Sequence, residues 1–452
     1  MEQNARALAY HVLIDIQKNG AYANLALDKA LLRSELNPND RRLATDLVYG
    51  CTKMQLHLDQ IIGAYCDLKR TDKKSLMLLR MAVYQLTFLE KIPDHAVLNE
   101  TVALAKAEGL RTDKFINGVL RSMLRKEKAV TWPDKRKQRS QYYAKWYSFP
   151  QWLIDIWVKE YGFQATEQLC SYFNQPAATW IRVNTLKASV ADVIHALEAQ
   201  NAEFFQHPHP LPQKFAQQHP QLPEAIRVAS LQPVKNSGLI ARGKVTVQDL
   251  SSMLPAVVLQ PKNNAKILDM CAAPGGKTTH LSAIMENSGE IVACDLHPHR
   301  VGLIEENVKR LGVQNVRCIT GESQDLPASF HAAFDAILLD APCSGLGVLN
   351  RRADLRWRIR RSNLPEIEAL QRDLLEAATR YLVPGGTLVY STCTLNKKEN
   401  EEQIAQFLER HPDFAPVPFD CLGETCASGM KTIYPYIDHS DGFFIAKLKR
   451  KD

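Results

Sequence analysis

The feature that most constrains the fold of this chain is a change of pattern near residue 246. From there on, short apolar stretches alternate with longer stretches of helical periodicity. Such alternation indicates a parallel sheet covered by helices on both faces. We expect strands at Lys266–Met270, Glu290–Cys294, Val316–Ile319, Phe334–Leu339 and Thr387–Tyr390, with helices near 277–287, 298–311, 364–381 and 397–410.

The first 128 residues have a different periodicity. Apolar residues recur there at spacings of three and four, as in Leu8, Val12 and Ile16, which predicts five to seven packed helices. Pro38 and Pro93 fall in gaps between these helices, where helix-start residues are common. The fold class is therefore multidomain, with an all-α domain and an α/β Rossmann-like domain. We place the boundaries at 1–139 for the helical domain and its basic linker, 140–245 for a mixed α+β connector, and 246–452 for the Rossmann-like domain.

Positive charge is concentrated at the N-terminal side of the chain. Residues 1–139 contain 24 Lys and Arg against 16 Asp and Glu, a net charge of +8, whereas residues 140–452 contain 32 against 33, a net charge of −1. A basic module beside a nearly neutral one indicates an accessory domain that binds a polyanion. A solvated basic face without a ligand is the alternative on charge alone.

Composition excludes several classes of protein. No apolar run is long enough to span a membrane, and the first residues lack the pattern of a signal peptide, so we expect a cytoplasmic protein. The ten cysteines include no CxxC pair, which favours free thiols over a disulfide scaffold and argues against a metal. His207 and His209 lie in a Pro-rich stretch, 205–223, that favours a surface loop over a metal site.

A glycine-containing turn follows the first expected strand and opens a helix. The turn runs from Cys271 to Lys277, and Asp295 ends the next strand about twenty residues further on. Glycines let a ligand approach the backbone closely, and a carboxylate at the second strand end hydrogen-bonds ribose hydroxyls. These residues predict a nucleoside cofactor, and by themselves they fit NAD as well as S-adenosylmethionine.

Two cysteines follow later strands. Cys343 lies in Asp340-Ala341-Pro342-Cys343-Ser344-Gly345 after the fourth strand, and Cys393 lies in Ser391-Thr392-Cys393 after the fifth. A single cysteine at such a position is more often a buried apolar residue. Two of them at the sheet edge that carries the cofactor turn, with an aspartate beside them, favour a catalytic site.

Methylation at C5 of cytosine needs this set of groups. A thiolate that adds at C6 makes C5 electron-rich enough to accept a methyl group. A carboxyl group near N3 stabilises the charge that develops on the ring, and a further group helps to remove the C5 proton. Cys393, Asp340 and Cys343 supply these groups, whereas hydride transfer with NAD has no use for a thiol pair.

The sequence resembles the Sun-type (RsmB) RNA cytosine-C5 methyltransferases over nearly its whole length. In the C-terminal two-thirds the matching segments are Arg182–Leu186, Val247–Asp249, Cys271–Lys277, Asp340–Gly345, Arg351, Asp354–Trp357, Ser391–Cys393, Glu399–Glu401 and Asp441–Phe444. The N-terminal helices resemble the NusB-like RNA-binding domain of that family through Ala5-Arg6, Asn24–Leu27, Asp40-Arg41, Leu47–Gly50 and Leu58-Asp59.

The resemblance implies roles for individual residues. Cys393 would be the nucleophile, Cys343 would assist proton removal and release, and Asp340 would line both the cofactor and the target-base pocket. The Pro-Cys thiol is the nucleophile in DNA C5 enzymes, so this assignment rests on the RNA family, and spacing does not decide it. Glu322 stands where the family has an aspartate on the adenine side, and Asp325 is its alternative. The residues that would bind S-adenosylmethionine are Cys271, Ala272, Ala273, Pro274, Gly275, Gly276, Lys277, Asp295, Arg300, Glu322 and Asp340.

The partner implied by the resemblance is 16S ribosomal RNA, naked or in an early small-subunit particle. We also expect RNA contacts from the arginines between Asn350 and Arg361, which are interleaved with Trp357. No membrane and no metal are expected, and we expect a monomer. The alternatives are a transfer RNA cytosine-C5 methyltransferase, a catalytically inactive rRNA-binding assembly factor, and a thiol hydrolase or NAD oxidoreductase on a similar sheet.

Overall fold

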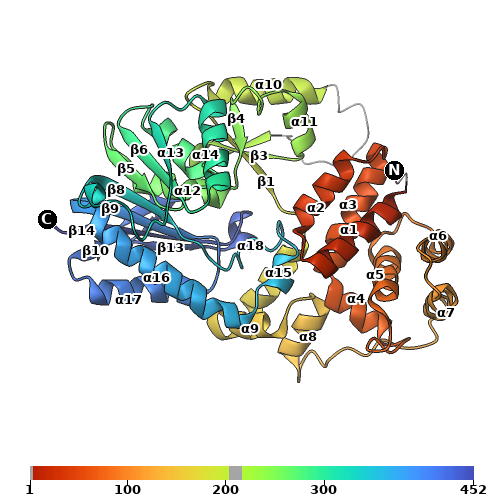
Figure 1. Cartoon of the computed structure of the whole chain (residues 1–452). Coiled ribbons are helices and arrows are strands. Elements are labelled where there is room, and N and C mark those ends of the chain that lie inside the picture. The colour runs from red at the N-terminus through yellow and green to blue at the C-terminus, as the bar shows by residue number, and fades with distance from the viewer. Residues whose placement is uncertain (1–3, 203–215) are drawn as a thin grey trace. The chain divides into compact units, whose positions relative to one another are not determined.

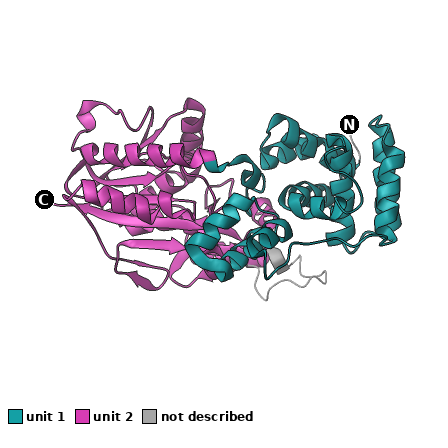
Figure 2. Ribbon diagram, turned by 90° about the horizontal axis from the view of Figure 1, so that it is seen from below, with its two compact units in different colours: residues 1–176, 349–361 teal, residues 177–348, 362–452 magenta. Residues whose placement is uncertain are grey.

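The computed structural model describes residues 4–202 and 216–452, which form two compact units. Unit 1 contains the chain up to Pro176 together with Leu349–Arg361, and unit 2 contains Ala177–Val348 and Ser362–Asp452 (Figure 2). A short segment from the second half of the sequence therefore belongs to the N-terminal unit. None of the helices in the described ranges is long and apolar enough to cross a membrane.

The described residues of unit 1, from residue 4 on, form helices and no strands (Figure 1). Asn4, Asn37 and Asp72 begin α1, α3 and α5, because their side chains accept hydrogen bonds from the first backbone amides of each helix. Pro38 is the first residue of α3, and Pro93 immediately precedes α6. The helices are α1 Ala5–Asn19, α2 Ala23–Leu32, α3 Pro38–Lys53, α4 Gln55–Ile62, α5 Lys73–Phe88, α6 Asp94–Ala107, α7 Asp113–Leu124, α8 Arg139–Trp146, α9 Gln151–Asn174 and α15 Leu355–Arg358.

The periodic apolar residues of the first seven helices form one core, with Leu47, Leu58 and Leu79 completely buried. These helices confirm the expected all-α organisation of the N-terminal domain. Arg80 in α5 is also buried there, and it pairs with both carboxylate oxygens of Asp59 at 2.7 Å. A bidentate pair of this kind neutralises the arginine inside an apolar core.

Arg356 corrects the expectation that the arginines of 350–361 contact RNA. Its side chain is completely buried in unit 1 and lies 4.0 Å from the centre of the Phe149 ring. It donates to the carbonyls of Ser148 and Lys53, at 3.1 and 3.3 Å, and to the side chain of Asn174 at 3.0 Å. A buried guanidinium with these partners is a structural group, so the RNA expectation was wrong for this residue.

The neighbouring Trp357 is held in a similar way. Its indole N–H donates to the Thr52 carbonyl at 2.6 Å, so this ring is hydrogen-bonded to α3. Arg358 lies 3.8 Å from the centre of the Tyr22 ring and donates to the Gly20 carbonyl at 2.7 Å. The segment Leu349–Arg361 is therefore fixed to unit 1 by side chains that the sequence pattern had suggested for RNA.

We expect Arg356→Met to lower the stability of unit 1 strongly. The substitution keeps much of the side-chain volume but leaves several buried acceptors without donors, which costs about 3–5 kcal/mol in total. Calorimetry is expected to show the unit 1 transition lowered on the order of 10 °C. Arg352→Met, at an exposed position of the same segment, is the control. Equal transitions for both variants would contradict a structural role for Arg356.

Unit 2 begins with a small antiparallel sheet in the order β2-β3-β1-β4. The strand β1 lies inside this sheet and pairs with both β3 and β4. Residues 205–215 of the expected Pro-rich loop lie outside the described residues, and the stretch after them forms β2 and β3 instead of continuing as a loop. The elements are β1 Thr179–Val183, α10 Val190–Ala202, β2 Ala216–His219, β3 Leu222–Val228, α11 Leu231–Asn236 and β4 Val245–Val247.

The main sheet of unit 2 has the order β10-β14-β9-β8-β5-β6-β7, and β13 pairs with β14 outside this path. The five expected strands are β5 to β9 and run parallel, which confirms the Rossmann-like class. The sheet is nevertheless mixed, because β14, β10 and β13 add an antiparallel edge. Its strands are β5 Lys266–Asp269, β6 Glu290–Asp295, β7 Val316–Thr320, β8 Phe334–Asp340, β9 Leu382–Thr392, β10 Phe414–Pro416, β13 Met430–Ile433 and β14 Phe443–Arg450.

Helices cover both faces of this sheet (Figure 1). Leu268 and Ile337 point to the face covered by α16 and α17, whereas Ile267 and Leu338 point to the face covered by α12 and α13. This alternation follows from the two-residue period of a strand. The remaining elements are α12 Leu250–Leu259, α13 Gly276–Ile284, α14 Pro298–Leu311, η1 Ala328–Phe330, η2 Arg361–Asn363, α16 Leu364–Tyr381, η3 Lys397–Glu399, α17 Glu401–Arg410, β11 Phe419–Cys421, β12 Glu424–Cys426 and α18 Pro435–Asp438.

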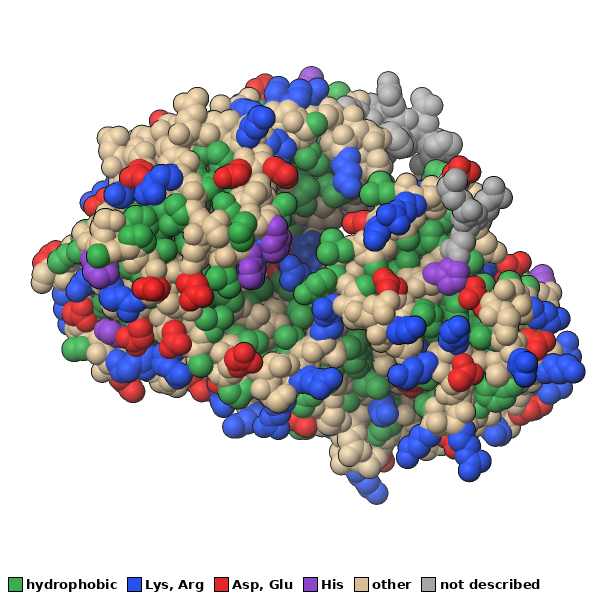
Figure 3. Space-filling view, in the orientation of Figure 1, with side chains coloured by type: hydrophobic (Ala, Val, Ile, Leu, Met, Phe, Trp, Pro, Cys, Tyr) green, Lys and Arg blue, Asp and Glu red, His purple; other side chains and the backbone are tan. Residues whose placement is uncertain are grey.

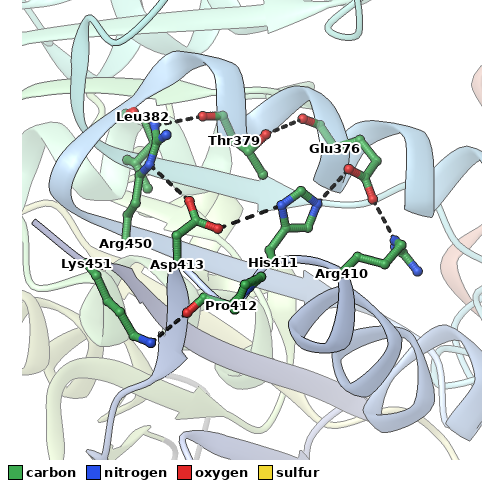
Figure 4. Close-up of polar contacts among 9 residues, drawn as sticks. All are labelled: Glu376, Thr379, Leu382, Arg410, His411, Pro412, Asp413, Arg450 and Lys451. Atoms are coloured by element: carbon green, nitrogen blue, oxygen red, sulfur yellow. Dashed lines mark hydrogen bonds and ion pairs between the residues drawn. The ribbon is translucent and has the colours of Figure 1, made fainter.

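A polar network joins α16, α17 and β14 at the outer end of the sheet (Figure 4). His411 lies between Glu376 at 2.6 Å and Asp413 at 3.9 Å. Arg450 continues the network from Asp413, at 3.4 Å, to the carbonyl of Leu382, at 2.7 Å. These contacts tie the C-terminal strand to the two helices of one face. Leu382 is the first residue of β9, so the network lies at the amino end of this strand, away from the carboxyl end that precedes Cys393.

Candidate active site

The candidate residues lie at the carboxyl ends of the parallel strands. β5 leads into the Cys271–Lys277 turn, β8 ends at Asp340, and β9 ends one residue before Cys393. The chain runs outward from β5 to β7 and then returns to the other side of β5 to form β8. Ligands of open α/β sheets bind at such a point of reversal, because the loops on the two sides separate there.

Cys343 and Cys393 face each other across two neighbouring loops. Their sulfur atoms are 3.3 Å apart, and both side chains are half-buried. The hydrogen bond with Cys393 and burial raise the pKa of the Cys343 thiol well above its usual value. All ten cysteines of the chain lie in the described ranges and are free thiols. The site therefore contains two free thiols in contact with each other.

Asp340 is the last residue of β8, three residues before Cys343, and is fixed on both oxygens. Lys277 Nζ is 2.6 Å from Oδ2, and the Ser391 hydroxyl donates to Oδ1 at 2.7 Å. Burial acts to lower the pKa of Lys277, but the charge and hydrogen bond of Asp340 outweigh it, so this pKa is raised. Lys277 consequently stays charged at neutral pH and holds the Asp340 carboxylate in one orientation.

The partnership of Lys277 with Asp340 was missed by sequence reasoning, which placed Lys277 in the cofactor turn alone. A signal was present, because Lys277 is the second residue of α13. A cation at a helix N-terminus is unfavourable with the helix dipole. Such a lysine indicates that an anion from another part of the chain lies beside it.

The cofactor turn has the conformation that its glycines allow. Gly275 has φ 94°, and a Cβ there would lie 3.1 Å from the Ile304 side chain. The Ala273 amide donates to Oδ2 of the buried Asp295 at 3.2 Å, and Arg300 pairs with Oδ1 at 3.2 Å. The Arg300 contact is an ion pair without hydrogen-bond geometry, so Oδ1 of Asp295 is buried and accepts no hydrogen bond. A buried carboxylate with this spare capacity, beside a glycine turn, fits the ribose of a nucleoside cofactor.

The remaining candidates are placed less specifically. Glu322 and Asp325 are both exposed on the loop after β7. The Gly321 amide at the start of this loop donates to the Asp295 carbonyl at 3.1 Å, so the loop lies against the end of β6. Either carboxylate is therefore on the side expected for the adenine. Within the ranges that the structure describes, no group of three or more His, Cys, Asp or Glu is arranged to hold a metal ion.

Asp269, beneath the turn, gives a testable pH dependence. Burial raises the pKa of this carboxyl from 3.8 to about 7, although the Thr278 hydroxyl donates to it at 2.7 Å. Between these pH values the folded protein binds a proton that the unfolded chain releases. The free energy of unfolding therefore falls as the pH rises from about 4 to 7.

We expect Asp269→Asn to remove this fall in the free energy of unfolding. Between pH 4 and 7, the free energy of unfolding of the variant minus that of wild type is expected to increase by up to about 4 kcal/mol. Urea unfolding between pH 4.5 and 7.5 measures the difference. Asp373→Asn changes an exposed carboxylate on α16 and serves as the control. Parallel pH profiles for Asp269→Asn and wild type would show that Asp269 is already ionised in the fold.

Comparisons with known proteins identify the family of this chain. Residues 256–449 match the family model described as 16S rRNA methyltransferase RsmB/F, residues 3–125 match the NusB family, and residues 149–235 match an RsmF/B-like ferredoxin-like domain. A probable ribosomal RNA small subunit methyltransferase B of Synechocystis is 38% identical, over 99% of both chains. The Bacillus subtilis protein of the same name is 34% identical, also over 99% of both chains.

The chain belongs to the RsmB/F family of methyltransferases. Its fold agrees with the crystal structure of NSun6 from Pyrococcus horikoshii with SFG, which is 26% identical and has a TM-score of 0.56. That comparison covers 67% of this chain and 99% of the other. The cofactor of this RsmB/F family member is S-adenosylmethionine, which sets the NAD alternative aside.

Proposed function

We propose that this protein methylates C5 of a cytosine in 16S rRNA through a covalent bond between Cys393 and C6 of the base. The observation that carries the proposal is the contact of two thiols, 3.3 Å apart, beside a carboxylate fixed by Lys277. Few reactions of S-adenosylmethionine require a thiol pair, whereas C5 methylation of a pyrimidine needs a nucleophile that later leaves.

The residues of the cofactor turn fit S-adenosylmethionine. Asp295, held by Arg300, would accept the ribose hydroxyls, and Glu322 or Asp325 would accept from the adenine amino group. The backbone from Cys271 to Gly276 would line the methionine and ribose part. When bound there, S-adenosylmethionine supplies the methyl group that C5 receives.

Each residue of the thiol site has one role in the proposal. Cys393 attacks C6, and Asp340 stabilises the charge that develops on the ring at N3. The choice of Cys393 as the attacking sulfur follows the resemblance to the RNA family, and Cys343 lies 3.3 Å from it, within reach of the same base. After methylation, the C5 proton passes to solvent water with the assistance of Cys343, the electrons of the C5–H bond re-form the C5–C6 double bond, and Cys393 leaves C6 as a thiolate.

Three observations support 16S rRNA as the substrate. The relatives carry the name ribosomal RNA small subunit methyltransferase B, and the helices of unit 1 match the NusB family. Figure 3 shows many Lys and Arg side chains on the right of the view, over the helices of unit 1. By the resemblance to the Sun-type family, the target would be cytosine 967 of 16S rRNA, in naked RNA or an early small-subunit particle, and the enzyme would act as a cytoplasmic monomer.

The test incubates the protein with methyl-labelled S-adenosylmethionine and either a 16S rRNA transcript or transfer RNA, followed by mapping of 5-methylcytosine. We expect one labelled cytosine in the 16S transcript and none in transfer RNA. Label in transfer RNA alone would reassign the substrate. Binding of S-adenosylmethionine and rRNA without any transfer would favour the inactive assembly factor.

A further inference from the structure

A buried carboxylate lies between the loops that carry the two thiols. Glu399 is the last residue of η3 and is completely buried. It contacts neither sulfur through a hydrogen bond. Its sequence neighbourhood resembles a family motif, but neither the mechanism nor the motif gives this side chain a task. A buried charge is costly unless several donors surround it, so its surroundings show what it is for.

Glu399 accepts hydrogen bonds from both thiol loops. Ser344, which follows Cys343, donates its backbone amide to Oε2 at 2.8 Å and its hydroxyl to Oε1 at 2.5 Å. On the loop that follows Cys393, Asn396 donates to Oε1 at 3.0 Å and the Thr394 hydroxyl lies 3.4 Å from it. One carboxylate thus joins the residues directly after each thiol.

The helix α16 also contributes a residue, Gln371, that links Glu399 to the Cys343 loop. Gln371 of α16 donates to Glu399 Oε2 at 3.0 Å and to the carbonyl of Pro342 at 2.9 Å, which immediately precedes Cys343. The hydroxyls of Ser344 and Thr394 are also 2.8 Å apart. The Cys343 loop is therefore fixed on both sides of the thiol, and the Cys393 loop is fixed against it.

We propose that Glu399 is a positioning residue that sets the distance between the Cys343 and Cys393 sulfur atoms. Its named partners present N–H and O–H groups to both carboxyl oxygens, so the hydrogen bonds of one side chain hold the two loops against each other. The proposal rests on the proposed function for its catalytic consequence, since methylation and release need both thiols at the same base. The spacing itself is independent of the substrate.

Glu399→Gln is the variant that tests this role. It keeps the size of the side chain, but its amide nitrogen has to face a donor, so at least one of the two loops loses its anchor. Glu402→Gln, at an exposed position three residues further on, is the matched control. Ser344→Ala removes one hydroxyl contact, and it keeps the test decisive if Glu399→Gln fails to fold.

The first readout is independent of methylation. Diamide converts the two thiols into a disulfide: each sulfur loses its hydrogen, the S–S bond forms, and diamide is reduced to the hydrazine. Mass spectrometry of the linked peptides gives the rate. We expect this rate to fall at least about tenfold in Glu399→Gln and a few-fold in Ser344→Ala, with no change in Glu402→Gln. The second readout is methylation, for which kcat is expected to fall about 10- to 100-fold while KM for S-adenosylmethionine stays within about twofold.

The outcomes separate this inference from the proposed function. Slow disulfide closure together with reduced kcat supports Glu399 as the positioning residue. Closure at the wild-type rate in the folded variants overturns it, whatever the effect on kcat. If the wild type methylates no RNA, the proposed function fails, and the closure rate alone still decides whether Glu399 sets the spacing. Slow closure with unchanged kcat would overturn the catalytic importance of that spacing.

Discussion

Cys393→Ala is expected to abolish methylation, with a fall in rate of at least about a thousandfold. Without the sulfur, no covalent bond forms at C6, and C5 is too poor a nucleophile to react. Loss of a covalent nucleophile is among the largest single effects in enzyme kinetics. Single-turnover transfer of label to the 16S transcript measures the rate, and binding of S-adenosylmethionine is expected to remain within a few-fold of wild type.

Cys343→Ala is expected to behave differently, although its sulfur is only 3.3 Å from that of Cys393. The attack at C6 remains possible, but release is impaired, so a covalent protein–RNA complex accumulates and appears as a slow band on a denaturing gel. Cys318→Ala, at a half-buried cysteine of β7, serves as the control and is expected to methylate normally. If Cys393→Ala trapped the complex and Cys343→Ala were inactive, the roles of the two thiols would be exchanged.

Asp340→Asn is expected to lower the single-turnover rate about a hundred- to ten-thousandfold, the range for loss of a general acid or base. The amide is a weaker partner for the ring at N3, and its NH₂ group replaces one oxygen, so either Lys277 or Ser391 loses its acceptor. The carboxylate holds both groups, at 2.6 and 2.7 Å, so the substitution also frees the Lys277 ammonium. The defect is expected in the chemical step, with little change in affinity for RNA.

A double-mutant cycle separates the two effects of Asp340→Asn. If Lys277 acts by holding Asp340, Lys277→Met lowers the rate by itself, and the double variant is little worse than Asp340→Asn alone. Asp373→Asn, at an exposed position of α16, is the control for loss of a carboxylate. Additive losses in the double variant would show that Lys277 acts on the substrate or cofactor independently.

Much of the fold was predictable because its pattern is local. Most parallel strands of unit 2 are short stretches rich in apolar residues, and the helices between them show a clear period, so β5 to β8 were expected within one residue at each end and the second half of β9 was expected as well. The antiparallel edge was not expected. Phe443–Arg450 has two lysines and an arginine among apolar residues and follows short strands with weak patterns. Its pairing with β9 depends on contacts between residues about fifty to sixty positions apart in the sequence.

The site residues were likewise predictable only where the sequence pattern is local. The strand-end positions of Asp295, Asp340 and Cys393 follow from the parallel topology, so sequence alone could bring them to one edge. The bonds of Lys277 to Asp340 and of Glu399 to Ser344 join residues 63 and 55 positions apart, and no local pattern encodes them. The prediction of an RNA contact for Arg356 was wrong for a related reason. A run of charged residues has the same sequence pattern whether it lies on a surface or contains a buried guanidinium. The roles of the site residues and the boundaries at 139 and 245 stay predictions.

The position of Leu349–Arg361 within unit 1 has a consequence for synthesis of the chain. The polypeptide up to Pro176 leaves the ribosome long before this segment exists, and at about 5–20 residues per second the delay is roughly ten to forty seconds. During that time the carbonyls that Arg356 later occupies can bond only to water. The N-terminal helices therefore cannot complete their packing until a segment encoded far downstream has been synthesised. A nascent chain interrupted before residue 361 has an incomplete first unit.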